Sequence, residues 1–146
     1  MVRLIGAARR ADDVLTFEER KDAKASAINA RRDALLTGGY TVEAGVMAGK
    51  VLQTRDVDDR NNWLVSQTTY TIAVGAGHGA VEDAHFRTED NVSFTLSYAD
   101  GQAVLLAMAA WGAAVMRNSW TLKDAVTAAA DDAALDAIDI EMGWPT

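Results

Sequence analysis

Apolar residues at helical spacing, three and four positions apart, alternate along this chain with short stretches of strand-like alternation. Residues 16–36 are dominated by Ala, Arg, Lys and Glu, all strong helix formers. Thr16 and Glu19 form a T-x-x-E capping box, in which hydroxyl and carboxylate satisfy amide groups that a helix start leaves unpaired. Gly38 and Gly39 end the segment. The pattern predicts a helix over residues 16–36.

The apolar face of this helix is narrow and consists mostly of alanine. Phe17, Ile28 and Leu35 are its larger members. Such a seam packs either against the rest of the chain or against copies of itself in a parallel bundle, and both alternatives stay open. We name these three residues as a candidate oligomer interface.

Two β-hairpins are predicted. Residues 40–42 and 50–54 are short strand-like runs whose connection contains glycines. Residues 86–88 and 92–96 alternate apolar and polar side chains around residues 89–91, where Asp and Asn suit a tight turn.

Three further helical regions follow from apolar periodicity and capping residues. One begins at Asp56 and ends near Gly75, and a second begins at the S-x-x-D box of Ser97. Trp120 and Thr121 are expected to interrupt that second helix, and Asp131 opens a last short one. Residues 75–85 are expected to be a polar loop.

These elements predict an α+β fold. It has an N-terminal extended arm with a strand at residues 2–5, one helix, two small hairpins and Ala-rich helices forming one compact body. We expect residues 1–39 to be the arm and helix for attachment or oligomerisation, and residues 40–146 to be the body.

Composition narrows the functional classes. The chain has 146 residues, no cysteine and a net charge of −7, so disulfides, thiolate metal sites and general nucleic-acid binding are not expected. It has no apolar run of the ~20 residues that span a bilayer and no signal-peptide pattern. We expect a soluble protein made in the cytoplasm. Residues 1–37 are slightly basic and residues 100–146 acidic, a polarity that suits contacts between subunits or a solvated surface.

The acid-rich stretch QTRDVDDRNNW, residues 53–63, raises the question of a metal site. A calcium loop starting at Asp56 would need oxygen ligands at its fifth and twelfth positions and glycine at its sixth, but Arg60, Gln67 and Asn61 stand there. The alternative is a helix start with Asp56 as N-cap, Asp58 and Asp59 lying at the positive end of the helix dipole. We favour the cap.

Other candidate chemistry is weak. His78, Glu82, Asp83 and His85 have metal-ligand side chains, but the surrounding glycines disfavour one helical face. The stretch GAGHGA follows a helical pattern, so it does not match a dinucleotide-binding loop. Neither histidine lies near a distinctive serine. We predict no catalytic, cofactor-binding or metal-binding residue.

Four longer stretches appear in a familiar order: INARRDALLTGGYTVEAG, KVLQTRDVDDRNNW, FRTEDNVSFTLSYAD and ALDAIDIEMGWP. Across residues 28–145 this order resembles a domain of unknown function common in tailed bacteriophages. The chain departs from that family at Arg55, which stands between the usual Thr and Asp, and in its longer segment 75–85. Members are commonly parts of tail-fibre, baseplate or tail-assembly proteins, and the resemblance transfers no catalytic residue.

The resemblance implies a non-enzymatic structural or adaptor protein of a phage virion, connecting components of the tail tip, baseplate or tail fibre. Its expected partners are other tail proteins and further copies of itself, in a trimer or ring. Its expected location is the phage tail, after synthesis in the bacterial cytoplasm. Two alternatives remain: an assembly chaperone absent from the mature virion, and a carbohydrate-binding or hydrolytic receptor module using Trp120, Trp144 and residues 75–85.

Overall fold

The computed structural model describes residues 14–146, so the strand predicted at residues 2–5 lies outside the described residues. Four helices and two antiparallel hairpins give an α+β fold, as predicted. In chain order they are α1 (Phe17–Thr37), β1 (Tyr40–Thr41), β2 (Val51–Leu52), α2 (Val57–Gly75), β3 (Glu82–Arg87), β4 (Ser93–Ser97), α3 (Tyr98–Ala128) and α4 (Asp132–Asp136).

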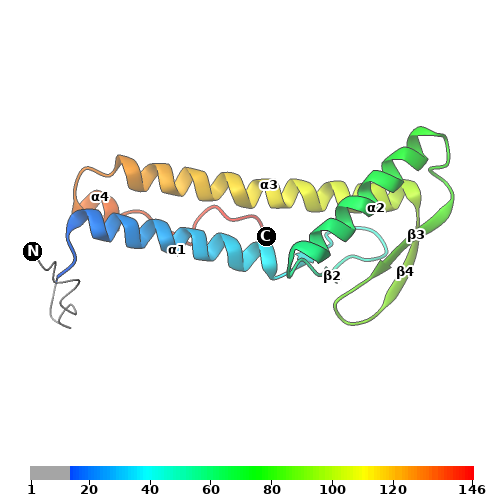
Figure 1. The fold of residues 1–146 in the computed structure, drawn as a ribbon, viewed down its shortest axis with the longest axis horizontal. Coiled ribbons are helices and arrows are strands. Elements are labelled where there is room, and N and C mark those ends of the chain that lie inside the picture. Colours follow the sequence, from blue (N-terminus) through cyan, green and yellow to red (C-terminus); the bar gives the residue numbers. More distant parts are fainter. Residues whose placement is uncertain (1–13) are drawn as a thin grey trace, which may run out of the picture.

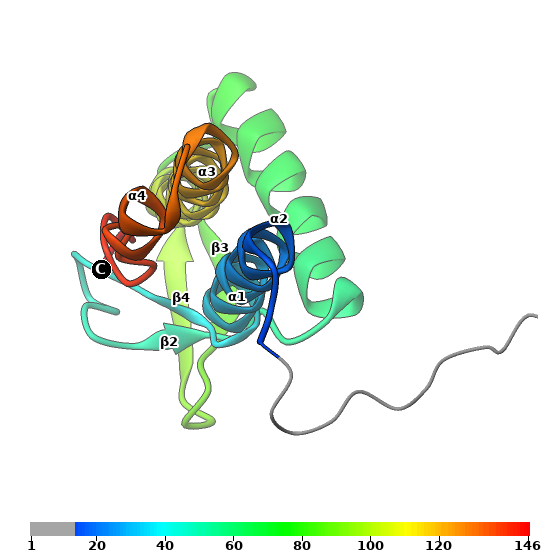
Figure 2. The same ribbon diagram turned by 90° about the vertical axis from the view of Figure 1, so that its left-hand side faces the viewer.

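Two long helices set the shape of the molecule. Figure 1 shows α1 and α3 running antiparallel, side by side, with α2 and the hairpins gathered at one end. In Figure 2 the view runs along the two helices, and α4 lies on one side of the pair while α2 lies on the other. We call α2, the hairpins and the start of α3 the head, and α1, α4 and the remainder of α3 the stalk.

The head has its own hydrophobic core. Phe86 on β3 stacks on Trp63 of α2 at 5.8 Å between ring centroids, and Tyr70 of α2 lies 6.0 Å from the same ring. Gly101 lets the hairpin approach α3 closely, because a Cβ there would lie 2.7 Å from the Cβ of Ala84. Aromatic contacts between α2 and β3, and the close approach of β3 to α3 at Gly101, therefore hold the head together.

The stalk has a second, separate core. Ile28 of α1 is fully buried and packs with Val126, Ala129 and Leu135. Leu135 lies on α4, so this short helix closes the far end of the stalk. The last residues add a further contact, since the Nδ2 of Asn118 donates a hydrogen bond of 3.0 Å to the carbonyl of Met142.

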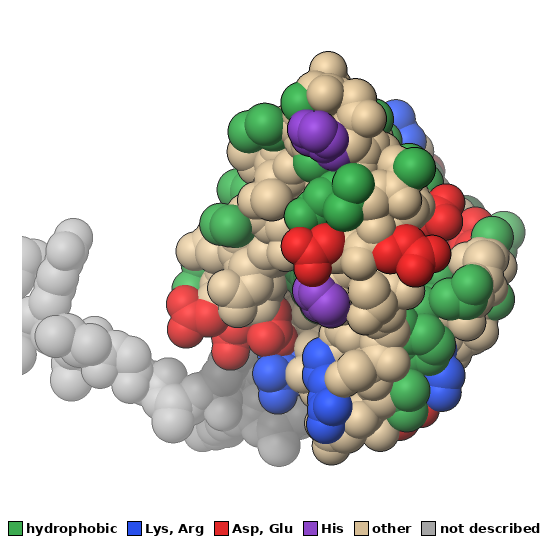
Figure 3. Space-filling model, turned by 90° about the vertical axis from the view of Figure 1, so that its right-hand side faces the viewer, with side chains coloured by type: hydrophobic (Ala, Val, Ile, Leu, Met, Phe, Trp, Pro, Cys, Tyr) green, Lys and Arg blue, Asp and Glu red, His purple; other side chains and the backbone are tan. Residues whose placement is uncertain are grey.

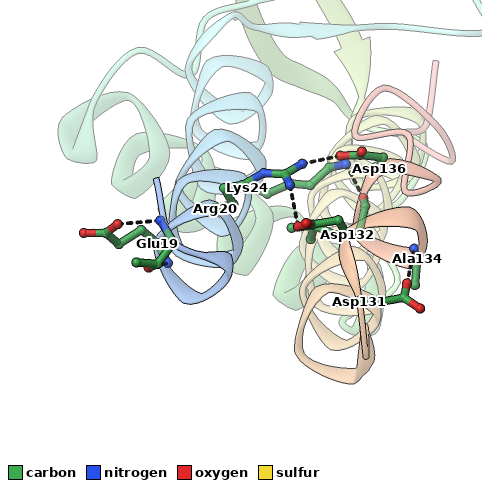
Figure 4. A network of polar contacts seen from close by, with 9 residues as sticks. Glu19, Arg20, Lys24, Asp131, Asp132, Ala134 and Asp136 are labelled. Carbon is green, nitrogen blue, oxygen red and sulfur yellow. Dashed lines mark hydrogen bonds and ion pairs between the residues drawn. The ribbon is translucent and has the colours of Figure 1, made fainter. Parts of the chain in front are cut away.

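Charged side chains fasten α1 to α4. In Figure 4, Arg20 reaches from α1 to the carboxylates of Asp132 and Asp136, and Lys24 donates to the carbonyl of Leu135. Arg31 forms a further ion pair with Glu141, at 3.0 Å. Ion pairs between the basic N-terminal region and the acidic C-terminal region therefore form within one chain.

Helix starts follow the predicted caps. Thr16 and Glu19 form the full capping box, and Ser97 accepts a hydrogen bond of 3.1 Å from the amide of Asp100. Asp131 caps α4 in the same way. At the end of α1, Gly39 adopts φ +98° and lies against Val51, where a side chain would clash.

Two predicted boundaries are wrong. α3 is continuous through Trp120 and Thr121, because neither residue breaks a helix. The hydroxyl of the buried Ser119 donates a hydrogen bond of 2.7 Å to the carbonyl of Met116, so it has a partner within the helix. β3 starts at Glu82, inside the segment expected to be a loop, because Ala84 and Phe86 both face the core and pair across to β4.

The division at residue 39 separates α1 from the first hairpin. α1 packs along α3, an element of the expected body. The structure gives no independent test of that division, which stays a prediction.

Candidate docking surface

The acid-rich stretch builds the start of α2. The carboxylate of Asp56 accepts a hydrogen bond of 2.9 Å from the amide of Asp59, so the predicted N-cap is confirmed. Asp59 in turn binds Arg55, with 2.9 Å between Oδ2 and the guanidinium Nε. That side-chain hydrogen bond, more than any other contact, holds the pKa of Asp59 below its ordinary value. Arg55, the departure from the family pattern, is therefore the partner of a helix-start carboxylate.

The histidine segment forms a different cluster from the one considered from sequence. His85 lies opposite Thr95 in the hairpin, with 3.2 Å between its Nδ1 and the Thr hydroxyl, while its Nε2 lies 2.8 Å from the carboxylate of Asp83. Tyr98 donates a hydrogen bond of 3.1 Å to the other oxygen of Asp83. Hydrogen bonds from His85 and then Tyr98 lower the pKa of Asp83.

Sequence reasoning missed Thr95 and Tyr98 in this cluster. The available signal was the register of the predicted hairpin, because extending its first strand back from residue 86 by one position places His85 opposite Thr95. The hydroxyl, imidazole and carboxylate stand in the order used by hydrolases, but the side chain of His85 is 67% exposed. Water therefore competes for each hydrogen bond, and the low-dielectric setting that activates a hydroxyl is missing. Across residues 14–146 no group of three or more His, Asp or Glu could hold a metal ion.

The end of the head that carries this cluster is shown in Figure 3. Histidine side chains lie near the top and the centre of this face, acidic side chains lie across its middle, Lys and Arg lie mostly below them, and hydrophobic side chains are scattered on both sides. A hollow of about 470 Å³ opens where the two hairpins meet, and its Lys50 and Asp90 are paired with each other at 2.6 Å. Neither charge of this pair is therefore free to bind a ligand in the hollow.

Of the three candidate interface residues, only Ile28 is fully buried. Phe17 packs against the same stalk core as Ile28. Leu35 is half-buried on α1. Of the two alternatives for this seam, the structure shows packing against the rest of the chain. Ile28 is therefore covered in this fold and is not accessible to a second copy.

An exposed apolar face lies instead on α2. Leu64 is 61% exposed, Val65 65% and Ile72 67%. They lie opposite buried Tyr70, on the side of α2 that points away from the head core. No Lys, Arg, Asp or Glu occurs from Asn61 to Gly77. A monomeric protein normally covers such a face with charged side chains, so this one is typical of a contact surface.

A groove adjoins this face. It has a volume of about 140 Å³ and lies between α2 and α3. Its walls are Trp63, Leu64 and Gln67 from α2 and Leu105, Met108 and Ala109 from α3, with Arg60 at one side. Aromatic and methionine side chains of this kind accept an apolar side chain from a partner.

α3 contributes further uncharged surface. Among the described helices it alone is long and apolar enough to cross a membrane by length and composition, and 17% of its most apolar 18-residue window is buried. One side packs on α1, α2 and the hairpins. The other side remains open to solvent or to a partner.

Comparison with known protein families assigns the chain to a family. Residues 19–140 match the family described as Domain of unknown function (DUF4376), a range that takes in nearly all of α1 as well as the head. No curated protein and no solved structure matches the chain. Since the match covers most of its length, the chain belongs to the DUF4376 family.

Proposed function

We propose that this protein is a non-enzymatic adaptor of a tailed-bacteriophage virion that connects components of the tail tip, baseplate or tail fibre. The phage context rests on the resemblance of residues 28–145 to a domain of tail-fibre, baseplate and tail-assembly proteins. The adaptor role rests on the uncharged, exposed face of α2, which is the single observation that carries it.

The physical argument for an adaptor is that this face serves nothing inside the chain. Leu64, Val65 and Ile72 point away from the core that Tyr70 and Trp63 help to build. Exposing large apolar side chains costs solubility unless a partner covers them. The adjoining groove offers a site where one anchoring side chain of the partner is desolvated. The partner is another tail protein with an apolar contact surface.

Mass spectrometry of purified virions tests the location. The protein is expected at a fixed ratio to the other tail proteins. A second test uses Val65→Lys with Ile72→Lys, which places charge on the α2 face at exposed positions and leaves the fold intact. This variant is expected to be missing from virions, or at least tenfold depleted, because a buried unpaired charge opposes docking.

Val46→Lys is the matched control, since Val46 is 73% exposed but lies in the β1–β2 connection, away from α2. It is expected to enter virions normally. Absence of the wild-type protein from virions would remove the adaptor proposal, and equal incorporation of both variants would remove the α2 face from it.

The assembly-chaperone alternative uses the same apolar face. A chaperone would bind its client through α2 during assembly and then leave, so it predicts α2-dependent complexes in cell extracts and none in the particle. In the receptor-module alternative, one of the two tryptophans is engaged within the chain. Trp144 is half-buried against the stalk core and donates its indole N–H to the carbonyl of Ile140 at 2.8 Å, leaving Trp120 as the exposed ring.

A further inference from the structure

The outward side of α3 in the stalk carries an ordered row of side chains. Ala113, Arg117, Trp120, Asp124 and Thr127 recur at spacings of four and three residues, and all five are exposed. This spacing keeps side chains on one seam, as in helices that pair with a second helix. In Figure 1 this part of α3, drawn in yellow to orange, has α1 below it and no element above it.

Trp120 is the outstanding member of this row. It is 52% exposed and belongs to neither hydrophobic core. Tryptophan is the residue type most enriched among those that dominate binding energy at interfaces. Trp120 lies between two charged residues of the row, so the row combines an apolar anchor with charges on both sides of it.

Arg117 and Asp124 are the charged members, and neither has an ion-pair partner within residues 14–146. Elsewhere in the stalk, Arg20 and Arg31 are paired. Arg117 lies three residues before Trp120 and Asp124 four residues after it, so the two charges flank the ring almost symmetrically. The charges of two such rows are therefore nearly complementary when the two helices run antiparallel.

Reversal decides which arrangement of two copies suits the charges. In a parallel pair, Arg117 would lie beside Arg117 of the other copy and Asp124 beside Asp124, which is repulsive. In an antiparallel pair centred near Trp120, Arg117 of each copy lies within about one helical turn of Asp124 of the other. The two tryptophans then meet near the two-fold axis, and the two ion pairs flank them.

We infer that this protein associates with a second copy of itself through α3, antiparallel and two-fold symmetric, with Trp120 at the centre and Arg117 paired to Asp124 across the contact. A two-fold contact of this kind uses the same patch on both subunits. It differs from the trimer or ring expected from the sequence for the seam of Phe17, Ile28 and Leu35, which stays a prediction. It does not depend on the phage context or on the α2 face.

The size of the contact sets its strength. Overlap of residues 113–127 covers about 22 Å of helix, roughly 10 Å wide, which is well below the ~800 Å² per partner of a stable interface. The dimer is therefore expected to be weak and to depend on concentration and on salt, because two exposed ion pairs contribute to it.

Sedimentation equilibrium of the full chain over a wide concentration range is the experiment. The wild type is expected to show a monomer–dimer equilibrium. Trp120→Ala is expected to remove the dimer over that range. Arg117→Asp alone and Asp124→Arg alone are each expected to weaken it at least about tenfold, because each places like charges opposite one another. The double variant Arg117→Asp/Asp124→Arg restores opposite charges and is expected to return to within about threefold of the wild type.

Two controls separate this contact from other effects. Asp22→Arg changes the charge at an exposed position of α1 and is expected to leave the dimer unchanged, as is Val65→Lys on α2. Circular dichroism confirms that each variant is folded. A wild-type chain that stays monomeric throughout overturns the inference. A dimer that survives Trp120→Ala, or one that the double variant does not restore, overturns the antiparallel contact.

Discussion

Three aspartates in one short stretch have three different roles. Asp56 accepts the amide hydrogen bond that opens α2, Asp59 binds Arg55, and Asp58 lies in the first turn of the helix, near the positive end of the helix dipole. Asp56→Ala is expected to lower the free energy of unfolding by about 1 kcal/mol, the usual cost of a lost N-cap. Urea unfolding is the measurement.

Asp58→Ala is the matched comparison for this cap. It removes only a favourable charge near the helix start and is expected to cost about 0.3 kcal/mol. Asp56→Asn should retain most of the stability, because asparagine caps as well as aspartate. Equal losses for Asp56→Ala and Asp58→Ala would contradict the assigned roles.

The Arg55–Asp59 pair makes stability depend on pH. The pKa of Asp59 lies below its ordinary value of 3.8 in the folded state, mainly because of the hydrogen bond from Arg55. A lowered carboxyl pKa adds stability at pH above the unfolded-state value, and that stability is lost as pH falls through the folded-state pKa. Arg55→Gln should therefore be less stable than the wild type at neutral pH.

The difference between these two proteins should shrink as the pH falls from 3.8 through the lower folded-state pKa of Asp59, since below that pKa both proteins carry a protonated Asp59. Urea unfolding at neutral and acidic pH measures it. Arg60→Gln serves as the control, because Arg60 contributes only a weak electrostatic effect on Asp59. A difference that stays constant with pH would show that Arg55 acts through packing rather than through charge.

Within the helix α3, replacing either of two glycines by alanine is expected to change stability in opposite directions. At Gly101 a Cβ would lie 2.7 Å from the Cβ of Ala84 and 3.2 Å from the ring of Tyr70, whereas at Gly112 nothing lies within 4 Å. Gly101→Ala is expected to cost about 1–3 kcal/mol by overpacking. Gly112→Ala is expected to add about 0.5–1 kcal/mol, since alanine loses less conformational entropy in a helix. Thermal unfolding followed by circular dichroism compares the two; a stabilising Gly101→Ala would disprove the close approach of β3 to α3.

For the whole molecule, the two separate cores predict two units of local unfolding. Leu135 is 1% exposed in the stalk core, far along the chain and along the stalk from the Tyr70–Phe86 core of the head. Leu135→Ala is expected to cost about 2–5 kcal/mol and to raise hydrogen exchange first in the N-terminal half of α1 and in α4.

Hydrogen exchange measured by mass spectrometry tests whether the stalk and the head unfold separately in this variant. Protection of α2, β3 and β4 is expected to remain close to that of the wild type under native conditions. A uniform rise over stalk and head would mean that the molecule unfolds as one unit.

Local chemistry in the sequence determined most of the elements of this protein. Thr16, Asp56, Ser97 and Asp131 cap helices because an oxygen at that position reaches free amides of the following turn, whatever the rest of the chain does. The β-turn residues and strand alternation likewise placed both hairpins, and with them the α+β class.

Only the tertiary structure decided which faces are covered. The sequence left Ile28 free to meet either the chain or a copy, and α4 and α3 cover it because Arg20 and Lys24 hold α4 against α1. The same packing leaves the α2 face and the Trp120 row exposed, although the apolar spacing of α2 looks no different from that of a buried helix. Periodicity shows that a helix has an apolar face, but the partner of that face is set by contacts between residues more than a hundred positions apart.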